Sequence, residues 1–314
     1  MNKIALVQDP HYLEHITGVM HPERPERLLV IKKMLTETGL IERAVSLEPR
    51  KATEEEIAGV HTRGLIEEVK ATQHRDSTYL DPDTHASRHS WEAAQLAAGG
   101  LLVAIDALTE GTVDEAFAFP RPPGHHAERD HAMGFCLFNN VAIAAQYALT
   151  KKGMKKILIL DFDVHHGNGT QHIFEERSDV FYISTHRYPF YPGTGSAHEL
   201  GRGKGEGYTL NLPMGAGEGD EDYEEVFGQK ITPAVLQYKP DLMILSAGFD
   251  AHRLDPLGGM EVTNEGYRRM AEHIEAMKKK CGNIPVLYAL EGGYSLKGLS
   301  ESVREVVEIM MGKT

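Results

Sequence analysis

The sequence predicts an α/β fold, with one domain over residues 1–314 and a mostly parallel sheet flanked by helices. Apolar runs typical of buried strands lie at 3–7, 115–119, 156–162, 180–185, 208–212, 241–247 and 285–290. Amphipathic segments typical of helices alternate with them at 25–38, 54–72, 89–110, 139–151, 220–238, 263–280 and 297–312. This alternation favours parallel strands with helices on both faces of the sheet. No repeat or linker divides the chain, so a single domain is the simplest prediction.

Five long stretches carry neither pattern, at 8–24, 73–88, 120–138, 186–207 and 248–262. Loops of this length inside a compact domain are usually functional. Four of them directly follow predicted strands, and the carboxyl ends of parallel strands meet at one edge of a sheet, where ligands bind. We therefore expect the chemistry of the protein at that edge.

Composition limits the classes of function. The chain has 33 basic and 46 acidic residues, and its formal net charge of −13 argues against nucleic acid as the main partner. The N-terminus lacks the long apolar segment of a secretion signal, and no run reaches the roughly 18 apolar residues of a membrane span, so no membrane partner is expected. Only Cys136 and Cys281 are present, which implies no disulfide framework and predicts a cytoplasmic location. The oligomeric state is left open.

Asp161, Asp163 and His165 lie at and just after the end of the predicted strand 156–162 and are expected on one side of the extended chain. An isolated Asp-x-Asp pair is more often a turn former or helix cap than a metal site. Here Val-His-His-Gly-Asn-Gly follows, and burying several polar side chains beside a strand is costly unless they are paired or bound to metal. Asp250 follows a later strand in the same way. Two aspartates and one histidine would leave a coordination position open, as a catalytic zinc site requires.

Two further motifs follow predicted strands. His125 and His126 lie in a proline-rich loop, and imidazoles suit acid–base catalysis because they titrate near neutrality. Tyr294 follows two glycines, and its phenol could donate a hydrogen bond to a developing oxyanion. Each motif alone is weak, because paired histidines occur in surface loops by chance and a loop tyrosine often only packs. Their shared position at the carboxyl edge favours a catalytic site.

Together, five motifs resemble the zinc-dependent histone deacetylase superfamily, which includes acetylpolyamine amidohydrolases and acetoin-utilisation proteins. The motifs are Arg121-Pro-Pro-Gly-His-His-Ala, Gly134-Phe-Cys, Asp161-Phe-Asp-Val-His-His-Gly-Asn-Gly-Thr-Gln, Gly248-Phe-Asp-Ala and Glu291-Gly-Gly-Tyr. The resemblance runs from His21-Pro-Glu-Arg-Pro-Glu-Arg27 to the helix after Tyr294. Asn168-Gly-Thr-Gln and Asp255-Pro-Leu-Gly-Gly259 are closer to the class II branch than to class I. The resemblance implies a class II-like bacterial deacetylase with the arginase/deacetylase-like fold.

The resemblance also implies catalytic roles. It implies one catalytic zinc ion per chain, held by Asp163, His165 and Asp250. The other matching catalytic positions are His125, His126, Asp161, Asn168 and Tyr294. His126 would be the general base, and Asn168 would be its neutral partner where some relatives have Asp. Asp161 would orient His125, and Tyr294 would polarise the acetyl carbonyl together with zinc.

Structural potassium sites and a substrate channel are implied as well. The first potassium site matches Asp161, Asp163, His165, Ser184 and Thr185. A second matches Phe174, Arg177, Val180 and Tyr223. The channel for the acyl-lysine chain matches Gly134, Phe135, Tyr191 and Leu257, and Arg27 matches an arginine near the acetate-release path. Tyr191 replaces a more usual phenylalanine.

The implied reaction removes an acetyl or other acyl group from the side-chain amine of lysine in peptides or proteins. A small acetylated amine, such as an acetylpolyamine, is the alternative substrate. Relatives that prefer acetylpolyamines carry glutamate where this chain has Leu257, which favours acetyl-lysine, although Glu14 or Glu23 could select polyamines instead. A non-catalytic acetyl-binding protein would need a broken metal or acid–base set, and none is visible. A two-metal arginase-like hydrolase would need further carboxylates where Asn168 and Thr170 stand.

Overall fold

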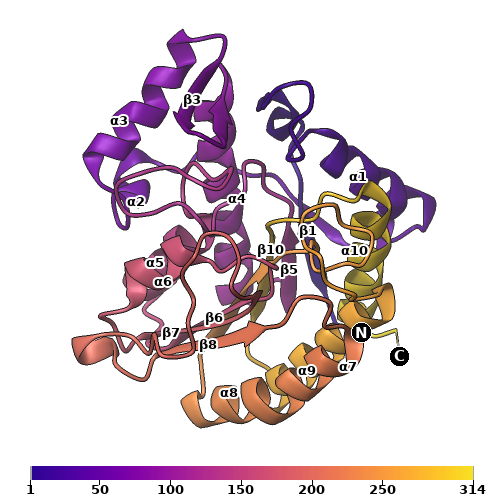
Figure 1. Ribbon diagram of the computed structural model, residues 1–314. Helices are drawn as coiled ribbons and strands as arrows, with labels where there is room; N and C mark the ends of the chain where they lie inside the picture. The colour runs from indigo at the N-terminus through magenta and orange to yellow at the C-terminus, as the bar shows by residue number, and fades with distance from the viewer. Residues whose placement is uncertain (1, 314) are drawn as a thin grey trace.

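The computed structural model describes residues 2–313, and at its centre lies an eight-stranded sheet (Figure 1). In spatial order the strands are β2 (Val45–Leu47), β1 (Ile4–Val7), β5 (Glu115–Ala118), β10 (Val286–Leu290), β9 (Leu242–Ala247), β6 (Ile157–Asp161), β7 (Val180–Arg187) and β8 (Thr209–Met214). Every neighbouring pair is parallel. The predicted parallel α/β sheet is confirmed.

Two layers of helices cover the sheet because its strands are apolar on both faces. Along β6, Leu158 and Leu160 join one core cluster, whereas Ile157 and Ile159 join the other. The first cluster is covered by α1 (Glu26–Glu37), α7 (Asp220–Val226), α8 (Thr232–Tyr238), α9 (Asn264–Lys280) and α10 (Leu296–Met310). The second is covered by α2 (Glu54–Ile57), α3 (Arg63–Ala71), α4 (Ser90–Thr109), α5 (Asn140–Lys151) and α6 (Asn168–Phe174).

Helix α4 is the most apolar of the long helices. Among residues 2–313 it is the one helix whose length and composition would allow it to cross a membrane, but 72% of its most apolar window is buried inside the protein. It packs against α5 and against the strand β5. These contacts are those of a core helix. Glu92 and Asp106 interrupt its apolar sequence, which is why the sequence shows no unbroken apolar run.

The structure differs from the predicted elements in short segments. The predicted helix 54–72 is two helices, because Thr62 caps a new helix by accepting a hydrogen bond from the backbone N–H of Leu65. The predicted helix 220–238 contains a π-helical segment, Phe227–Ile231. Strand β2, the helix α6 and the hairpin of β3 (Thr78–Asp81) and β4 (Thr84–Ala86) were not predicted. They are too short, three to seven residues, for a periodic pattern to show.

A buried ion-pair network ties the N-terminal segment to the loops at the carboxyl edge of the sheet. Glu23 lies between two guanidinium groups, with its Oε1 3.2 Å from Nη1 of Arg27 and its Oε2 2.9 Å from Nη2 of Arg121. All three side chains are fully buried. Arg27 also donates to the carbonyl groups of Glu291 and Gly293, at 2.5 and 2.7 Å. Burial alone would raise the pKa of Glu23, but Arg121 and Arg27 lower it to about 2.

Replacing this carboxylate should destabilise the protein. Glu23→Gln leaves two buried guanidinium groups without an anion, so we expect a loss of about 3–5 kcal/mol in the free energy of unfolding at neutral pH. Because the folded protein lowers the pKa of Glu23, its contribution is complete above the usual value of 4.5 and is lost as the pH falls through about 2. Urea unfolding of the wild type and of Glu23→Gln at pH 7 and pH 3 measures this contribution. The difference in the free energy of unfolding between the two proteins should be smaller at pH 3.

Glu37→Gln is the control, because the Glu37 carboxylate is 65% exposed in its pair with Lys33. It should change the stability by less than about 0.5 kcal/mol. If both variants lose the same free energy of unfolding, or if the difference between Glu23→Gln and the wild type does not depend on pH, the stability does not come from the buried network of Glu23.

Candidate metal centre and channel

The sheet order brings the sequence-predicted site residues together. β5, β10, β9 and β6 are four consecutive strands at the centre of the sheet. The loops that follow them carry the predicted catalytic and metal residues, namely His125, His126, Asp163, His165, Asp250 and Tyr294. All except Tyr294 are buried. The site is therefore built from loops held by the most central part of the fold.

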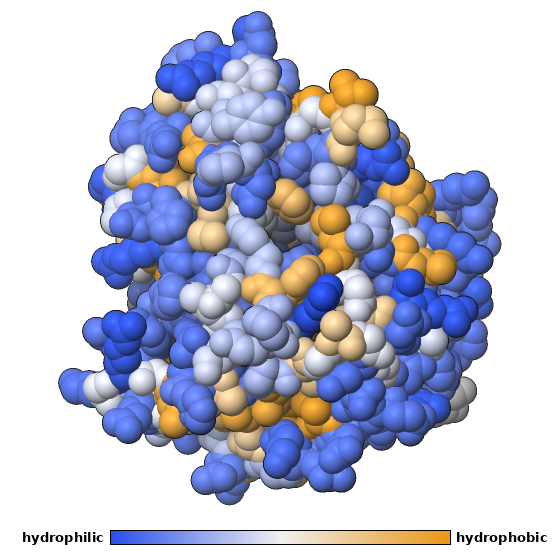
Figure 2. All heavy atoms as spheres, viewed as in Figure 1, coloured by the Kyte–Doolittle hydropathy of each residue, from blue (hydrophilic) through white to orange (hydrophobic). Residues whose placement is uncertain are grey.

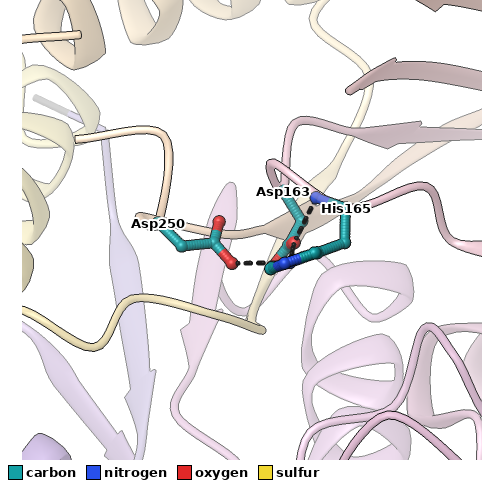
Figure 3. Close-up of side chains that lie close together, drawn as sticks. All are labelled: Asp163, His165 and Asp250. Atoms are coloured by element: carbon teal, nitrogen blue, oxygen red, sulfur yellow. Dashed lines mark hydrogen bonds and ion pairs between the residues drawn. The ribbon is translucent and has the colours of Figure 1, made fainter. Parts of the chain in front are cut away.

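Asp163, His165 and Asp250 point toward one another (Figure 3). Nδ1 of His165 lies 3.1 Å from Oδ1 of Asp163 and 3.1 Å from Oδ2 of Asp250. One ligand atom from each residue lies within 4.8 Å of the others. Two carboxylates and an imidazole at this spacing fit one divalent cation, and the donor set is the one zinc uses in catalytic sites. The loops after the other two central strands, β5 and β10, adjoin the group, since His125 lies 3.8 Å from Asp163 and the N–H of Gly292 donates to the same carboxylate.

Backbone N–H groups fix the two carboxylates. The N–H of Gly292 donates to Oδ2 of Asp163 at 2.8 Å, and the N–H of Val164 donates to Oδ1 of Asp250 at 2.9 Å. Gly292 approaches so closely that a Cβ there would lie 2.1 Å from Oδ2 of Asp250. Only glycine fits at this position. Each carboxylate therefore has one oxygen held by the backbone and another directed to His165.

Buried negative charge dominates the electrostatics of the group. Burial and the neighbouring Asp163 raise the pKa of Asp250 to about 7. Burial would lower the pKa of His165, but hydrogen bonds to both aspartates raise it to about 10. A proton on His165 thus offsets part of the negative charge of the two aspartates, and a metal ion that binds through Nδ1 must displace it.

The two adjacent histidines have different partners. Nδ1 of His125 lies 3.0 Å from Oδ2 of Asp161, and Nδ1 of His126 lies 2.7 Å from Oδ1 of Asn168. Burial opposes the charge on His125, but Asp163 and Asp161 raise its pKa to about 10. Burial and the charge on His125 lower the pKa of His126 well below its usual value. Near neutral pH, His126 is therefore the member of the pair that can accept a proton.

The backbone of Tyr294 is held by Asp255, a residue for which no role was predicted. Oδ2 of Asp255 accepts hydrogen bonds from the backbone N–H groups of Tyr294, at 2.6 Å, and Ser295, at 3.0 Å. Its Oδ1 accepts from the N–H of Leu257 at 2.9 Å. Burial raises the pKa of Tyr294 well above its usual value, so the phenol keeps its proton as a hydrogen-bond donor. Asp255 stands in the Asp-Pro-Leu-Gly-Gly motif, and aspartate before a proline-containing turn is the signal that could have indicated this role.

A cavity of about 100 Å³ opens over the metal group. It is lined by Asp83, His126, Gly134, Phe135, His165, Tyr191, Leu257 and Tyr294. The predicted channel walls are all present, and the rings of Phe135 and Tyr294 meet edge to face with centroids 5.9 Å apart. Asp83, from the unpredicted hairpin, was missed because nothing in the sequence places that hairpin beside the channel. In the same view as Figure 1, apolar side chains gather near the centre of a mainly hydrophilic face (Figure 2).

Arg27 and Glu23 lie away from that cavity. Arg27 is absent from its lining, and its guanidinium lies 5.1 Å from the ring centroid of Tyr294 within the buried network. Glu23 is fully buried between arginines, so the suggestion that it could attract a polyamine is wrong. Glu14 is exposed and lies 3.6 Å from His89.

The residues of the two predicted potassium sites are arranged differently. In the first set, Asp161 and Ser184 pair across β6 and β7. Thr185 is the next residue of β7, so its side chain points to the other face of the sheet, where its hydroxyl is buried without a hydrogen-bond partner among the described residues. In the second set, Phe174 and Val180 belong to one core cluster, but Tyr223 belongs to the cluster on the other face of the sheet. The side chain of Tyr223 is therefore separated from the other members. The match of Tyr223 to this site rests on the resemblance alone, and the sequence does not show on which face of the sheet its side chain lies.

Fold and site together are those of a class of protein, the parallel α/β proteins with a group of residues that could hold one divalent cation at the carboxyl edge of the sheet. Residues 21–310 match the family model of the Histone deacetylase domain. The chain belongs to the histone deacetylase family.

Relatives and solved structures agree with this assignment. Histone deacetylase 15 of Arabidopsis thaliana is 45% identical over 298 residues, which cover 93% of this chain and 53% of that protein. A probable deacetylase of Archaeoglobus fulgidus is 42% identical over 296 residues, covering 94% of this chain and 82% of the relative. The crystal structure of the HDA15 HD domain superposes with a TM-score of 0.95 at 43% identity, over 99% of this chain and 89% of that one. The chain thus spans about half the length of the plant protein.

The metal site can be tested without an activity assay. Asp250→Asn removes one ligating charge, so metal content should fall from about one zinc per chain to well below it. Added zinc should raise the melting temperature of the wild type but not that of the variant. A ligand at 100 times its Kd stabilises the folded state by about 2.7 kcal/mol, which is enough to detect. Elemental analysis and calorimetry measure both quantities.

Asp76→Asn is the control for the change in charge, because the side chain of Asp76 is 87% exposed. It should leave metal content and the zinc-dependent rise unchanged. Equal zinc binding by Asp250→Asn and the wild type would remove Asp250 from the ligand set.

Proposed function

We propose that this protein is a zinc-dependent deacetylase that hydrolyses the acetyl amide on the side chain of lysine in peptides or proteins. The observation that carries the proposal is the composition of one cavity. His126, His165 and Tyr294 line the same space of about 100 Å³, so a base, a metal ligand and an oxyanion donor all reach it. A non-catalytic acetyl-binding protein would not need this set.

The protein's own residues support distinct steps of amide hydrolysis. When bound, zinc would act as a Lewis acid on the acetyl carbonyl and increase the acidity of the attacking water. His126, neutral near pH 7, would take a proton from that water. Tyr294 would donate its hydroxyl hydrogen to the oxyanion. Phe135 and Tyr191 would hold the alkyl chain of lysine and exclude water, leaving the acetyl group near the base.

A structural potassium ion at the first predicted site is part of the proposal. Asp161 is fully buried at the end of β6, and burial raises its pKa. A monovalent cation beside Asp161 and Ser184 would favour the ionised form of Asp161. That form is the one that orients His125. For the second site, the side chain of Tyr223 lies on the other face of the sheet. The proposal for that site is therefore limited to Phe174, Arg177 and Val180, which lie at the end of α6, in the following loop and at the start of β7.

Substrate class is proposed from the wall of the channel. Leu257 lines the cavity with an apolar side chain, where a glutamate would attract the distal ammonium group of a polyamine. Asp83 also lines the cavity, and its Oδ1 already accepts from the backbone N–H of Gly134 at 3.0 Å. Acetyl-lysine is therefore the favoured substrate, and an acetylpolyamine is the second candidate because of that one carboxylate.

Removing the phenol of Tyr294 should slow the reaction with little effect on the fold. Tyr294→Phe should lower kcat by roughly 10²–10³, the scale of one oxyanion donor, and retain zinc and the melting temperature. Turnover of an acetyl-lysine peptide by zinc-loaded protein measures it. An unchanged kcat would exclude Tyr294 from the reaction. Tyr79→Phe is the matched control, since Tyr79 is 68% exposed and should leave kcat unaltered.

Leu257→Glu should shift substrate preference. We expect the wild type to have a higher kcat/KM for an acetyl-lysine peptide than for N-acetylspermidine. The added carboxylate should raise the relative kcat/KM for the polyamine by about tenfold, the scale of one favourable charge contact. Leu254→Glu adds the same charge on an exposed position outside the lining of the cavity and serves as the control. A wild type that prefers the acetylpolyamine would overturn the choice of substrate.

A further inference from the structure

A chain of hydrogen bonds continues from His126 toward the surface, beyond the residues with assigned roles. Oδ1 of Asn168 lies 2.7 Å from Nδ1 of His126, and Nδ2 of Asn168 donates to Oε1 of Glu128 at 2.5 Å. Nδ1 of His172 lies 2.8 Å from the same oxygen. Glu128 is 8% exposed, and the side chain of His172 is 37% exposed. The chain thus begins at the cavity and ends near solvent.

The backbone on both sides of this chain is fixed. Glu128 lies two residues after His126, its N–H donates to the carbonyl of His131 at 3.0 Å, and its carbonyl lies 2.8 Å from Nδ1 of His61. Asn168 and His172 lie one turn apart on α6. The carboxylate of Glu128 therefore bridges two side chains of one helix from a loop whose own backbone is held.

The direction of each bond follows from the chemistry of Glu128. An ionised carboxylate only accepts hydrogen bonds, so the atom of Asn168 that faces it must be the amide nitrogen. The amide oxygen then faces His126, and an oxygen there only accepts, so Nδ1 of His126 must carry the hydrogen. In a neutral imidazole this leaves the lone pair on Nε2.

We propose that Glu128 is a positioning residue, which sets the tautomer of His126 through the orientation of the Asn168 amide. The inference rests on the proposed role of His126 as the general base. Among the described residues, the other contacts of Nδ2 of Asn168 are longer, 3.4 Å to the carbonyl oxygen of His126 and 3.3 Å to the sulfur of Met133. The flipped amide would present its nitrogen to Nδ1 of His126 and so place the hydrogen on Nε2, where a base needs its lone pair. Glu128 selects the useful orientation from 40 residues earlier in the chain.

If Glu128 had a purely structural role, the expected effect of substitution would be different. If Glu128 only ties its loop to α6, any side chain of the same shape that bonds to Asn168 will suffice. Glu128→Gln keeps the shape but can donate or accept, so it holds Asn168 in either orientation. We expect kcat to fall about tenfold, a fraction of the roughly 10²–10⁴ that a general base contributes, with KM and zinc content unchanged.

In a protein that already carries Asn168→Asp, Glu128→Gln should change kcat in the opposite direction. Asn168→Asp places a carboxylate against the carboxylate of Glu128, and the two repel, so kcat should fall. In that background Glu128→Gln supplies an N–H donor to the new carboxylate and should raise kcat about tenfold. The same substitution is thus harmful in the wild type and beneficial with Asn168→Asp. Glu308→Gln is the control, because it alters a carboxylate of similar burial on α10 that pairs with Arg304 and Lys313, and it should change kcat in neither background.

If Glu128→Gln changes kcat equally in the wild type and in Asn168→Asp, the proposed role of Glu128 is wrong. The wild type would still be active in that case. Failure of the proposed function would look different, since no acetylated amine would then be turned over by any protein in the set. Nitrogen-15 NMR of histidine-labelled, zinc-loaded protein gives an answer that does not depend on the double variant folding. Neutral His126 in the wild type should carry its hydrogen on Nδ1, and Glu128→Gln should add the other tautomer. A hydrogen on Nε2 in the wild type would exclude the proposed role.

Discussion

The whole site depends on burying several carboxylates at one edge of the sheet. Asp161, Asp163, Asp250 and Glu291 are each at most 1% exposed, and they lie at or just after the ends of three neighbouring strands. A group of buried anions is strongly unfavourable unless cations and hydrogen-bond donors compensate it. The imidazoles supply positive charge, the backbone supplies the donors, and a divalent ion held by Asp163, His165 and Asp250 would supply further positive charge. Metal binding and local structure are therefore one problem, since the ion stabilises the arrangement that binds it.

This requirement explains features that have no direct chemical role. Oε2 of Glu291 accepts the N–H groups of Gly124 and His125, at 2.7 and 3.2 Å, so a carboxylate of the last strand holds the loop of the paired histidines. Asp255 holds the turn of Tyr294 in the same way. The loop of the paired histidines and the turn of Tyr294 are thus each anchored by a carboxylate from a different loop. A displacement of one loop would release the others, which is why the site is built on the four central strands.

The sequence predicted the elements and residues whose signals are local. Seven of the eight sheet strands and the metal triad follow from apolar runs and from polar residues at their ends. β2 escaped because it has three residues and is partly exposed, so it shows neither length nor pattern. Asp83, Glu128 and Asp255 escaped for another reason. Their roles are defined by partners at least 39 residues away in the chain, and such pairs form only once the loops are folded together.

The contrast between the paired histidines shows how little sequence difference separates two roles. Their rings lie 4.0 Å apart and are equally buried, so desolvation disfavours the charged form of both. Asp161 offsets that cost at His125 with a full negative charge, whereas Asn168 offers His126 only an amide dipole. Once His125 is charged, its field further disfavours a second positive charge on His126. A carboxylate in place of Asn168 would weaken this asymmetry. The carboxylate of Glu128 contacts Asn168 rather than His126. It can therefore orient the base through the amide without placing a negative charge in contact with the imidazole.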